Sequence, residues 1–201
     1  MMDRTAIEGE IFIHRELWTV VSRQIENATK NPQGAFYDHL AAMVFAFHTL
    51  EAYLNFVGDR LAPSIWQDER NFKYPYSGFA GKLKKILELC SITEPDRSKR
   101  PYSTIWRLKD LRDLIAHGKP EKFSDIVDHS PDEEPSLYKE PFNGLVTHEN
   151  ACYAVEDIKS FIDMIHSAAK AKPLVNNDIL FGAEALGTIL QHSTGATRPC
   201  N

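Results

Sequence analysis

The sequence predicts an all-α protein, an up-and-down bundle of four to five helices. In several long segments, apolar residues recur at the three- and four-residue spacing of helices, and stretches with Gly or Pro, such as NPQG and GKP, separate those segments. The chain has 201 residues, of which 43% are hydrophobic. It can therefore form a core, and its length fits one domain better than two.

Six segments have the spacing or composition of helices. In chain order they are about residues 9–29, 36–61, 64–73, 79–90, 102–117 and 148–170. The second is rich in Ala, Leu, Met and Phe, so we expect it to be the central helix. The third is short and is set apart from the fourth by a Tyr-Pro pair and a Gly. The fifth should end directly after His117, because Gly-Lys-Pro follows it.

The expected organisation has three parts. Residues 1–34 should form an N-terminal helix packed on the bundle, residues 35–172 the bundle itself, and residues 173–201 a partly frayed C-terminal extension. Within the bundle, residues 123–147 combine six acidic residues with several prolines and lack steady periodicity. They predict a long acidic surface loop, with a pair of strands as the alternative.

Charge and cysteine content narrow the classes of function. A formal net charge of −5 argues against a protein that coats nucleic acid with its whole surface, so any such contact should be local. The three cysteines are far apart, which suits reduced thiols in a reducing compartment. The first residues lack the basic and apolar pattern of a secretory signal, and the run AAMVFAF is too short to cross a membrane. We therefore expect a cytoplasmic protein with no membrane contact.

Two charged residues lie on the apolar faces of predicted helices. On a helical wheel, Arg112 falls within an arc of leucines and isoleucines between 105 and 115, and Glu51 falls within the apolar arc of residues 40–57. A charge on a core-facing arc is costly unless it is paired or lines a site. We therefore predict a Glu51–Arg112 contact, which either organises the bundle or belongs to a functional site. His48 and Asn55 border the same arc and could reach such a site.

The segment LRDLIAHG, residues 111–118, resembles the signature of the HEPN superfamily, in which an Arg, a polar residue and a His end a late helix of a four- or five-helix bundle. The matching positions are Arg112, Asp113 and His117. The resemblance covers roughly residues 35–170 in architecture and about eight residues in motif. It implies a homodimer whose motif helices meet at the two-fold axis.

In catalytic members, the resemblance implies a metal-independent endoribonuclease without a cofactor. His117 would act as general base or acid in the attack of a ribose 2′-hydroxyl on phosphorus, which leaves a 2′,3′-cyclic phosphate. Arg112 would stabilise charge on the phosphate, and Asp113 would orient the imidazole or raise its pKa. Glu51, which the wheel places against Arg112, is the fourth candidate catalytic residue. The simpler interpretations are a helix-terminal histidine for His117 and an ordinary surface acid for Asp113.

Residues near the motif suggest contacts to single-stranded RNA. The segment 82–122 holds eleven Lys or Arg against six acids, within a chain that is acidic overall. Lys109 and Lys119 are the candidate phosphate contacts, and Tyr102, with Tyr74 and Tyr76, could stack on bases. The alternative for this basic segment, and above all for the lysines of KLKK, is a solvated helix face followed by a loop.

Other chemistries find little support in the sequence. It has no Glu-x-x-His pairs for a metal-binding bundle, no phosphate-binding G-x-x-x-x-G-K loop and no G-x-S-x-G elbow. The resemblance implies a setting in bacterial defence, in a toxin–antitoxin pair or in RNA turnover, with an antitoxin or regulator as a further partner. The alternative function is a non-catalytic member of the same fold that binds protein or RNA.

Overall fold

The computed structural model describes residues 5–120, 128, 130, 142, 144–173, 181, 184–187 and 195–199. The described residues contain six α-helices and one 3₁₀ turn. These are α1 (Ile13–Lys30), α2 (Ala35–Leu61), α3 (Pro63–Trp66), the 3₁₀ turn Glu69–Asn71, α4 (Gly78–Cys90), α5 (Tyr102–His117) and α6 (His148–Lys170). The predicted all-α class is confirmed, and each predicted helical segment overlaps a helix, the third segment overlapping both α3 and the 3₁₀ turn.

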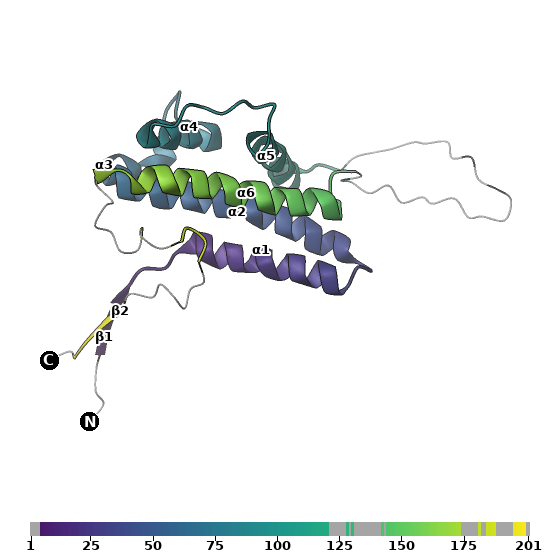
Figure 1. Cartoon of the computed structure of the whole chain (residues 1–201), viewed down its shortest axis with the longest axis horizontal. Coiled ribbons are helices and arrows are strands. Elements are labelled where there is room, and N and C mark those ends of the chain that lie inside the picture. Colours follow the sequence, from purple (N-terminus) through teal and green to yellow (C-terminus); the bar gives the residue numbers. More distant parts are fainter. Residues whose placement is uncertain are drawn as a thin grey trace.

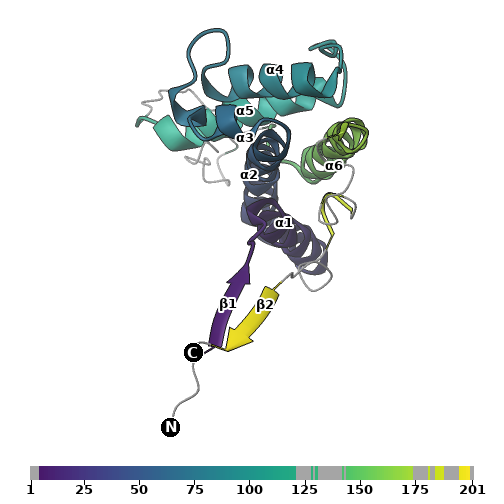
Figure 2. The same cartoon turned by 90° about the vertical axis from the view of Figure 1, so that its left-hand side faces the viewer.

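The helices form layers around α2 and α6, which lie side by side (Figure 1). Helix α1 runs along one side of α2, and α4 and α5 lie together on the opposite side (Figure 2). The core gathers large apolar side chains from four helices. They include Phe47, Leu50 and Leu54 of α2, Leu83 and Ile86 of α4, Ile105, Leu108 and Leu111 of α5, and Ile158, Phe161 and Ile162 of α6. Burial of these side chains is the main force that holds α4 and α5 over α2.

Helix α2 is the central helix that its composition predicts. It is also the one described helix with the length and apolarity to cross a membrane, with a mean hydropathy of 1.4 over its most apolar 18 residues. Half of that window is buried against the rest of the protein. A core helix of a soluble bundle passes the same test, because it too is apolar on most of its faces.

Close backbone approaches fix the short elements beside α2 and α4. A Cβ added to Gly58 would lie 2.1 Å from the indole ring of Trp66, so α3 packs onto α2 where α2 has no side chain. A Cβ added to Gly81 would lie 1.9 Å from the backbone of Tyr76. The chain before α4 can therefore lie against its first turns only because residue 81 is a glycine.

The start and end of the described chain form a small antiparallel ribbon that projects beyond α1 (Figure 2). Strand β1 (Thr5–Gly9) pairs with β2 (Gly195–Pro199), with Thr5 opposite Pro199 and Gly9 opposite Gly195. Residues 195–199 thus have regular structure inside the expected C-terminal extension. Most of the expected acidic loop, residues 123–147, lies outside the described residues.

Candidate functional site

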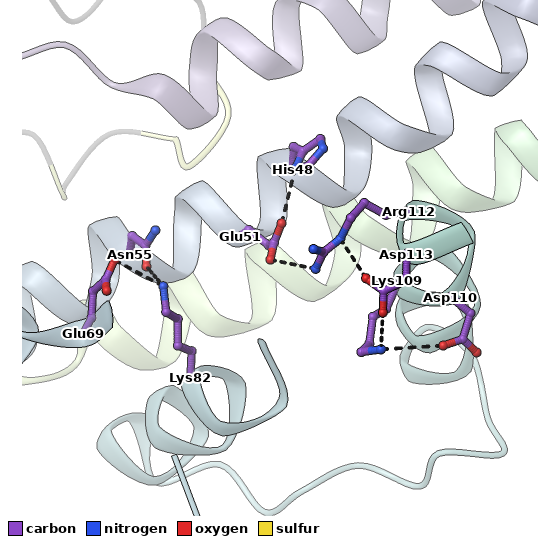
Figure 3. Close-up of polar contacts among 9 residues, drawn as sticks. All are labelled: His48, Glu51, Asn55, Glu69, Lys82, Lys109, Asp110, Arg112 and Asp113. Atoms are coloured by element: carbon purple, nitrogen blue, oxygen red, sulfur yellow. Dashed lines mark hydrogen bonds and ion pairs between the residues drawn. The ribbon is translucent and has the colours of Figure 1, made fainter. Parts of the chain in front are cut away.

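The predicted contact between Glu51 and Arg112 is present. Glu51 lies in the middle of α2 and Arg112 in the last part of α5, and the Arg112 Nη2 group donates a hydrogen bond to Glu51 Oε1 over 3.2 Å (Figure 3). The two side chains meet because the apolar faces of α2 and α5 pack together. The pair joins two residues that are 61 positions apart in the sequence.

The ion pair lies at the rim of the core and not inside it. The side chains of Arg112 and Glu51 are 25% and 29% exposed. The guanidinium carbon lies 5.1 Å from the centre of the Phe47 ring, which supports it from the core side. The Nε atom of Arg112 is buried without a hydrogen bond, although Asp113 Oδ1 is 3.4 Å away. Arg112 is therefore paired, but within the described chain its donors are not used up.

His48 extends the contact along α2. Its Nδ1 atom lies 3.2 Å from Glu51 Oε2, so the two oxygens of one carboxylate contact an imidazole and a guanidinium (Figure 3). The His48 side chain is 40% exposed. The expectation that His48 could reach the Glu51 site is confirmed by this distance, and the signal for it was the three-residue spacing on one helix.

Asp113 pairs first with Lys109. Lys109 Nζ donates to Asp113 Oδ2 over 2.7 Å and lies 3.8 Å from Asp110 Oδ1. The hydrogen bond from Lys109 lowers the pKa of Asp113 below its ordinary value, and the charges of Arg112, Lys109 and His117 act in the same direction. Asp113 is thus an ionised partner of two cations. Lys109 is half-buried, and any contact to a phosphate would compete with these carboxylates.

We refer to His48, Glu51, Lys109, Asp110, Arg112 and Asp113 as the Glu51 cluster. Its three carboxylates outnumber its two permanent cations, so a single copy of the cluster offers no net positive field to a phosphate. Within one protomer, cations outside the cluster would have to offset this excess of negative charge before a phosphate could bind.

The last turn of α5 faces solvent. His117 and Lys119 are exposed, and so are Leu114, at 44%, and Ile115, at 42%. The helical wheel places these two apolar residues on the same arc of α5 as the buried Leu111. They are nevertheless exposed, so the expectation that they face the core is not met. Helix α5 extends past the helices that cover its earlier turns, so its end presents an imidazole next to apolar side chains.

The prediction that Tyr102 stacks on RNA bases is wrong. Tyr102 is 2% exposed, its ring packs against Trp106 and Phe161, and its hydroxyl donates to Glu94 Oε1 over 3.1 Å. Burial, followed by the contact with Glu94, raises its pKa to about 12. Its ring faces are occupied by the core and are not available to a base.

The other two tyrosines that were considered for stacking differ from each other. Tyr74 is 92% exposed. Tyr76 donates its hydroxyl to Glu88 and has the Lys85 ammonium 4.7 Å from its ring centre. Tyr74 alone keeps both ring faces open.

A second polar contact lies one turn further along α2. Asn55 accepts a hydrogen bond from Lys82 of α4 over 3.2 Å, and Lys82 also lies 3.3 Å from Glu69 (Figure 3). Asn55 thus points toward α4 and not toward the Glu51–Arg112 pair. Glu51 and Asn55 of α2 therefore belong to two separate clusters.

Comparisons add no relatives to these observations. No protein-family model matches the chain, and neither the curated proteins nor the solved structures give a significant match. Among the described residues, no three His, Cys, Asp or Glu side chains converge as metal ligands would.

Proposed function

We propose that this chain is a HEPN-type endoribonuclease that acts without a metal, and the observation that carries the proposal is the partly exposed Glu51–Arg112 pair beside the end of α5. The two side chains are 29% and 25% exposed, so the guanidinium stays within reach of a substrate in solvent. The motif residue His117 follows at the same helix end and is exposed.

The proposed reaction divides the work between the two motif residues. His117 removes the proton from the ribose 2′-hydroxyl, whose oxygen attacks the neighbouring phosphorus while the bond to the 5′-oxygen breaks. The departing oxygen takes up a proton, and the RNA is left with a 2′,3′-cyclic phosphate. Arg112 binds the phosphate oxygens on which charge develops, a task that suits its planar set of donors.

A second copy of the chain solves one difficulty of the single protomer. Arg112 and His117 are five residues apart, about 140° around one helix, so they do not share a face. In a symmetric dimer built on the end of α5, Arg112 of one protomer could lie near His117 of its partner. Exposed Leu114 and Ile115 provide apolar surface for such an interface.

The first experiment is cleavage of a mixed single-stranded RNA in EDTA. Purified protein is compared with His117→Ala, Arg112→Ala and, as an exposed control on α6, Lys159→Ala, and an all-deoxy strand serves as the control substrate. We expect cyclic phosphate ends that require His117, Arg112 and the 2′-hydroxyl, with Lys159→Ala unaffected. Absence of cleavage by a folded dimer over a broad range of RNAs would contradict the proposal.

Complementation between variants tests the dimer. Arg112→Ala and His117→Ala subunits are co-expressed with different tags, and the mixed dimer is compared with each parent. If Arg112 and His117 act across the two-fold axis, the mixed dimer keeps one of its two sites intact and should have about half of the unmutated activity. If the two residues act within one protomer, or if the chain is monomeric in sedimentation, no activity returns.

The second candidate is a non-catalytic HEPN-fold dimer that binds RNA or protein. The excess of carboxylates in the Glu51 cluster favours it, because Glu51 already occupies the guanidinium that a phosphate would need. Retention of RNA without cleavage, lost in Lys119→Ala, would support this function. A role in defence, a toxin–antitoxin pair or RNA turnover, an antitoxin partner and a cytoplasmic location all belong to the proposal.

A further inference from the structure

A second chemical cluster lies away from the Glu51 cluster, where the first turns of α2 and α6 meet. Cys152 Sγ lies 3.6 Å from His148 Nε2, and the other ring nitrogen of His148, Nδ1, lies 3.2 Å from His39 Nε2. Cys152 and His148 sit four residues apart on α6, and His39 comes from α2. We refer to these three residues as the Cys152 relay.

The order of the donor and acceptor atoms sets the direction in which a proton would move, from the Cys152 thiol toward His39. If the thiol donates to His148 Nε2, then His148 Nδ1 carries a hydrogen and donates it to His39 Nε2. His39 must then be neutral. It is 7% exposed, and burial, followed by the charge of His148, lowers its pKa, which favours the neutral acceptor. Both nitrogens of His148 and the Nε2 atom of His39 therefore have roles that their surroundings permit.

The geometry suits a relay and not a shared metal ion. His148 uses opposite ring nitrogens for its two neighbours, so the thiol and the His39 imidazole lie on opposite sides of it. A metal ion would need all three donors to point at one position. A nucleophile, a base and a group that orients the base form the arrangement that activates catalytic thiols and hydroxyls.

Access differs sharply between the two described cysteines. Cys152 is partly exposed and His148 is exposed, so a small molecule can reach the sulfur. Cys90 is 4% exposed, and burial raises its pKa to about 11. Of the two described cysteines, Cys152 should therefore be the reactive one, and Cys90 serves as an internal control.

We propose that Cys152 is a reactive thiol, activated by His148 and oriented through His39, that undergoes exchange with low-molecular-weight disulfides. In the balanced step, His148 Nε2 takes the thiol proton and the Cys152 sulfur attacks one sulfur of the disulfide. The disulfide bond breaks, a mixed disulfide forms on Cys152, and the departing thiolate takes the proton from His148. No other oxidant is needed, because the small disulfide is the electron acceptor.

Among the described residues, the charged neighbours of the relay are engaged elsewhere or act on it only through their charge. Asp38 of α2 acts on His39 through its charge. On α6, Glu149 accepts a hydrogen bond from the Tyr153 hydroxyl over 2.9 Å, and Glu156 lies 3.3 Å from Arg100. Glu149 is adjacent to His148 in sequence, so Glu149→Gln changes the local charge and leaves the three relay residues in place.

The test measures the rate at which oxidised glutathione modifies Cys152 at pH 7 in EDTA. The full chain carries Cys200→Ser, and mass spectrometry of peptides separates Cys152 from Cys90. A free thiol is only a few per cent ionised at this pH, so activation can raise the thiolate fraction many-fold. A more readily formed thiolate is also a weaker nucleophile, so we expect a net gain of about tenfold in rate over a free thiol. The reference is an isolated peptide of sequence HENACYAVE, which is too short to hold a stable helix.

We expect folded Cys152 to react about tenfold faster than the peptide and Cys90 not to react. His148→Gln should bring the rate down to that of the peptide, His39→Leu should give an intermediate rate, and Glu149→Gln should change it less than twofold. Circular dichroism and urea midpoints check that the variants fold. A rate equal to that of the peptide in the unmutated protein, or an unchanged rate in folded His148→Gln, would overturn the proposal.

Discussion

A double-mutant cycle on Glu51 and Arg112 separates a structural ion pair from an accessible one. The cycle compares the free energy of unfolding of Glu51→Ala, Arg112→Ala, the double variant and the unmutated chain. Its coupling energy measures what the two side chains gain from each other. Each single variant also loses contacts of its own, such as the packing of Arg112 on the Phe47 ring, and these cancel in the cycle.

The structure sets the expected magnitude. The pair has one hydrogen bond of 3.2 Å, and its side chains are 25% and 29% exposed, so water screens it in part. Exposed pairs couple by up to about 1 kcal/mol, whereas breaking a fully buried pair costs about 3–5 kcal/mol. We expect a coupling energy of about 1 kcal/mol, at the upper end of the exposed class.

The assay is urea unfolding at one fixed protein concentration, because a dimer would make stability depend on concentration. The chain offers an exposed reference pair and one with a buried carboxylate. Lys159 and Asp163 of α6 are 56% and 47% exposed, whereas Arg100, 44% exposed, binds Asp157, 7% exposed. A coupling above about 3 kcal/mol, the range of fully buried pairs, would refute the reasoning. It would show that Glu51 and Arg112 form a structural ion pair that stabilises the contact between α2 and α5.

Three further predictions concern stability. Asp157→Ala should lower the free energy of unfolding by about 2–4 kcal/mol in urea, because the buried carboxylate accepts three hydrogen bonds whose donors would lose their partner. A loss below about 1 kcal/mol, the size expected for an exposed ion pair, would contradict this. Burial lowers the pKa of His14 from 6.5 to about 3. Between those values the unfolded chain binds the proton more tightly, so stability falls as the pH falls, by about 1.4 kcal/mol per pH unit from this residue. His14→Phe should reduce the measured slope between pH 6 and 4 by that amount, and an unchanged slope would show that His14 is not the group responsible. Gly81→Ala should lower the urea midpoint, at a cost of about 2 kcal/mol or more, because the new Cβ meets the backbone of Tyr76; a neutral effect would mean that the chain before α4 can move aside.

The helices could be predicted from the sequence because their ends are marked locally. Helix α5 ends at His117 where Gly-Lys-Pro follows, and α2 covers the apolar segment predicted for the central helix. The Glu51–Arg112 contact was predictable for a related reason. A charged residue on an otherwise apolar arc needs a partner, and each of these two arcs holds one residue of opposite charge.

Properties that depend on neighbouring elements could not be predicted. A wheel gives the direction of Leu114 and Ile115 but not how far the covering helices extend, so their exposure was missed. The burial of Tyr102 depends on Phe161, a residue of another helix. The Cys152 relay joins His39 to His148, 109 residues later, and no periodicity in either segment signals that contact. The pairing of β1 with β2 likewise depends on both ends of the described chain.

Helix α2 takes part in both proposed sites, and its polar residues are notable because they reduce the stability of a buried helix. A buried helix is most stable with apolar residues, and replacing buried charges by apolar groups is often neutral or stabilising. Yet α2 keeps His39, Glu51 and Asn55 on faces that pack against α6, α5 and α4. The Asn55 contact with Lys82 is explained as a link between helices.

Positions where a sequence departs from what stability favours are where function is expected. His39 and Glu51 are such positions on α2, and each contacts a group that can carry out chemistry, an imidazole or a guanidinium. The two clusters have no residue in common, so the ribonuclease proposal and the thiol proposal can fail separately. Loss of RNA cleavage in His117→Ala with unchanged Cys152 reactivity, together with the reverse result in His148→Gln, would show that α2 serves two independent sites.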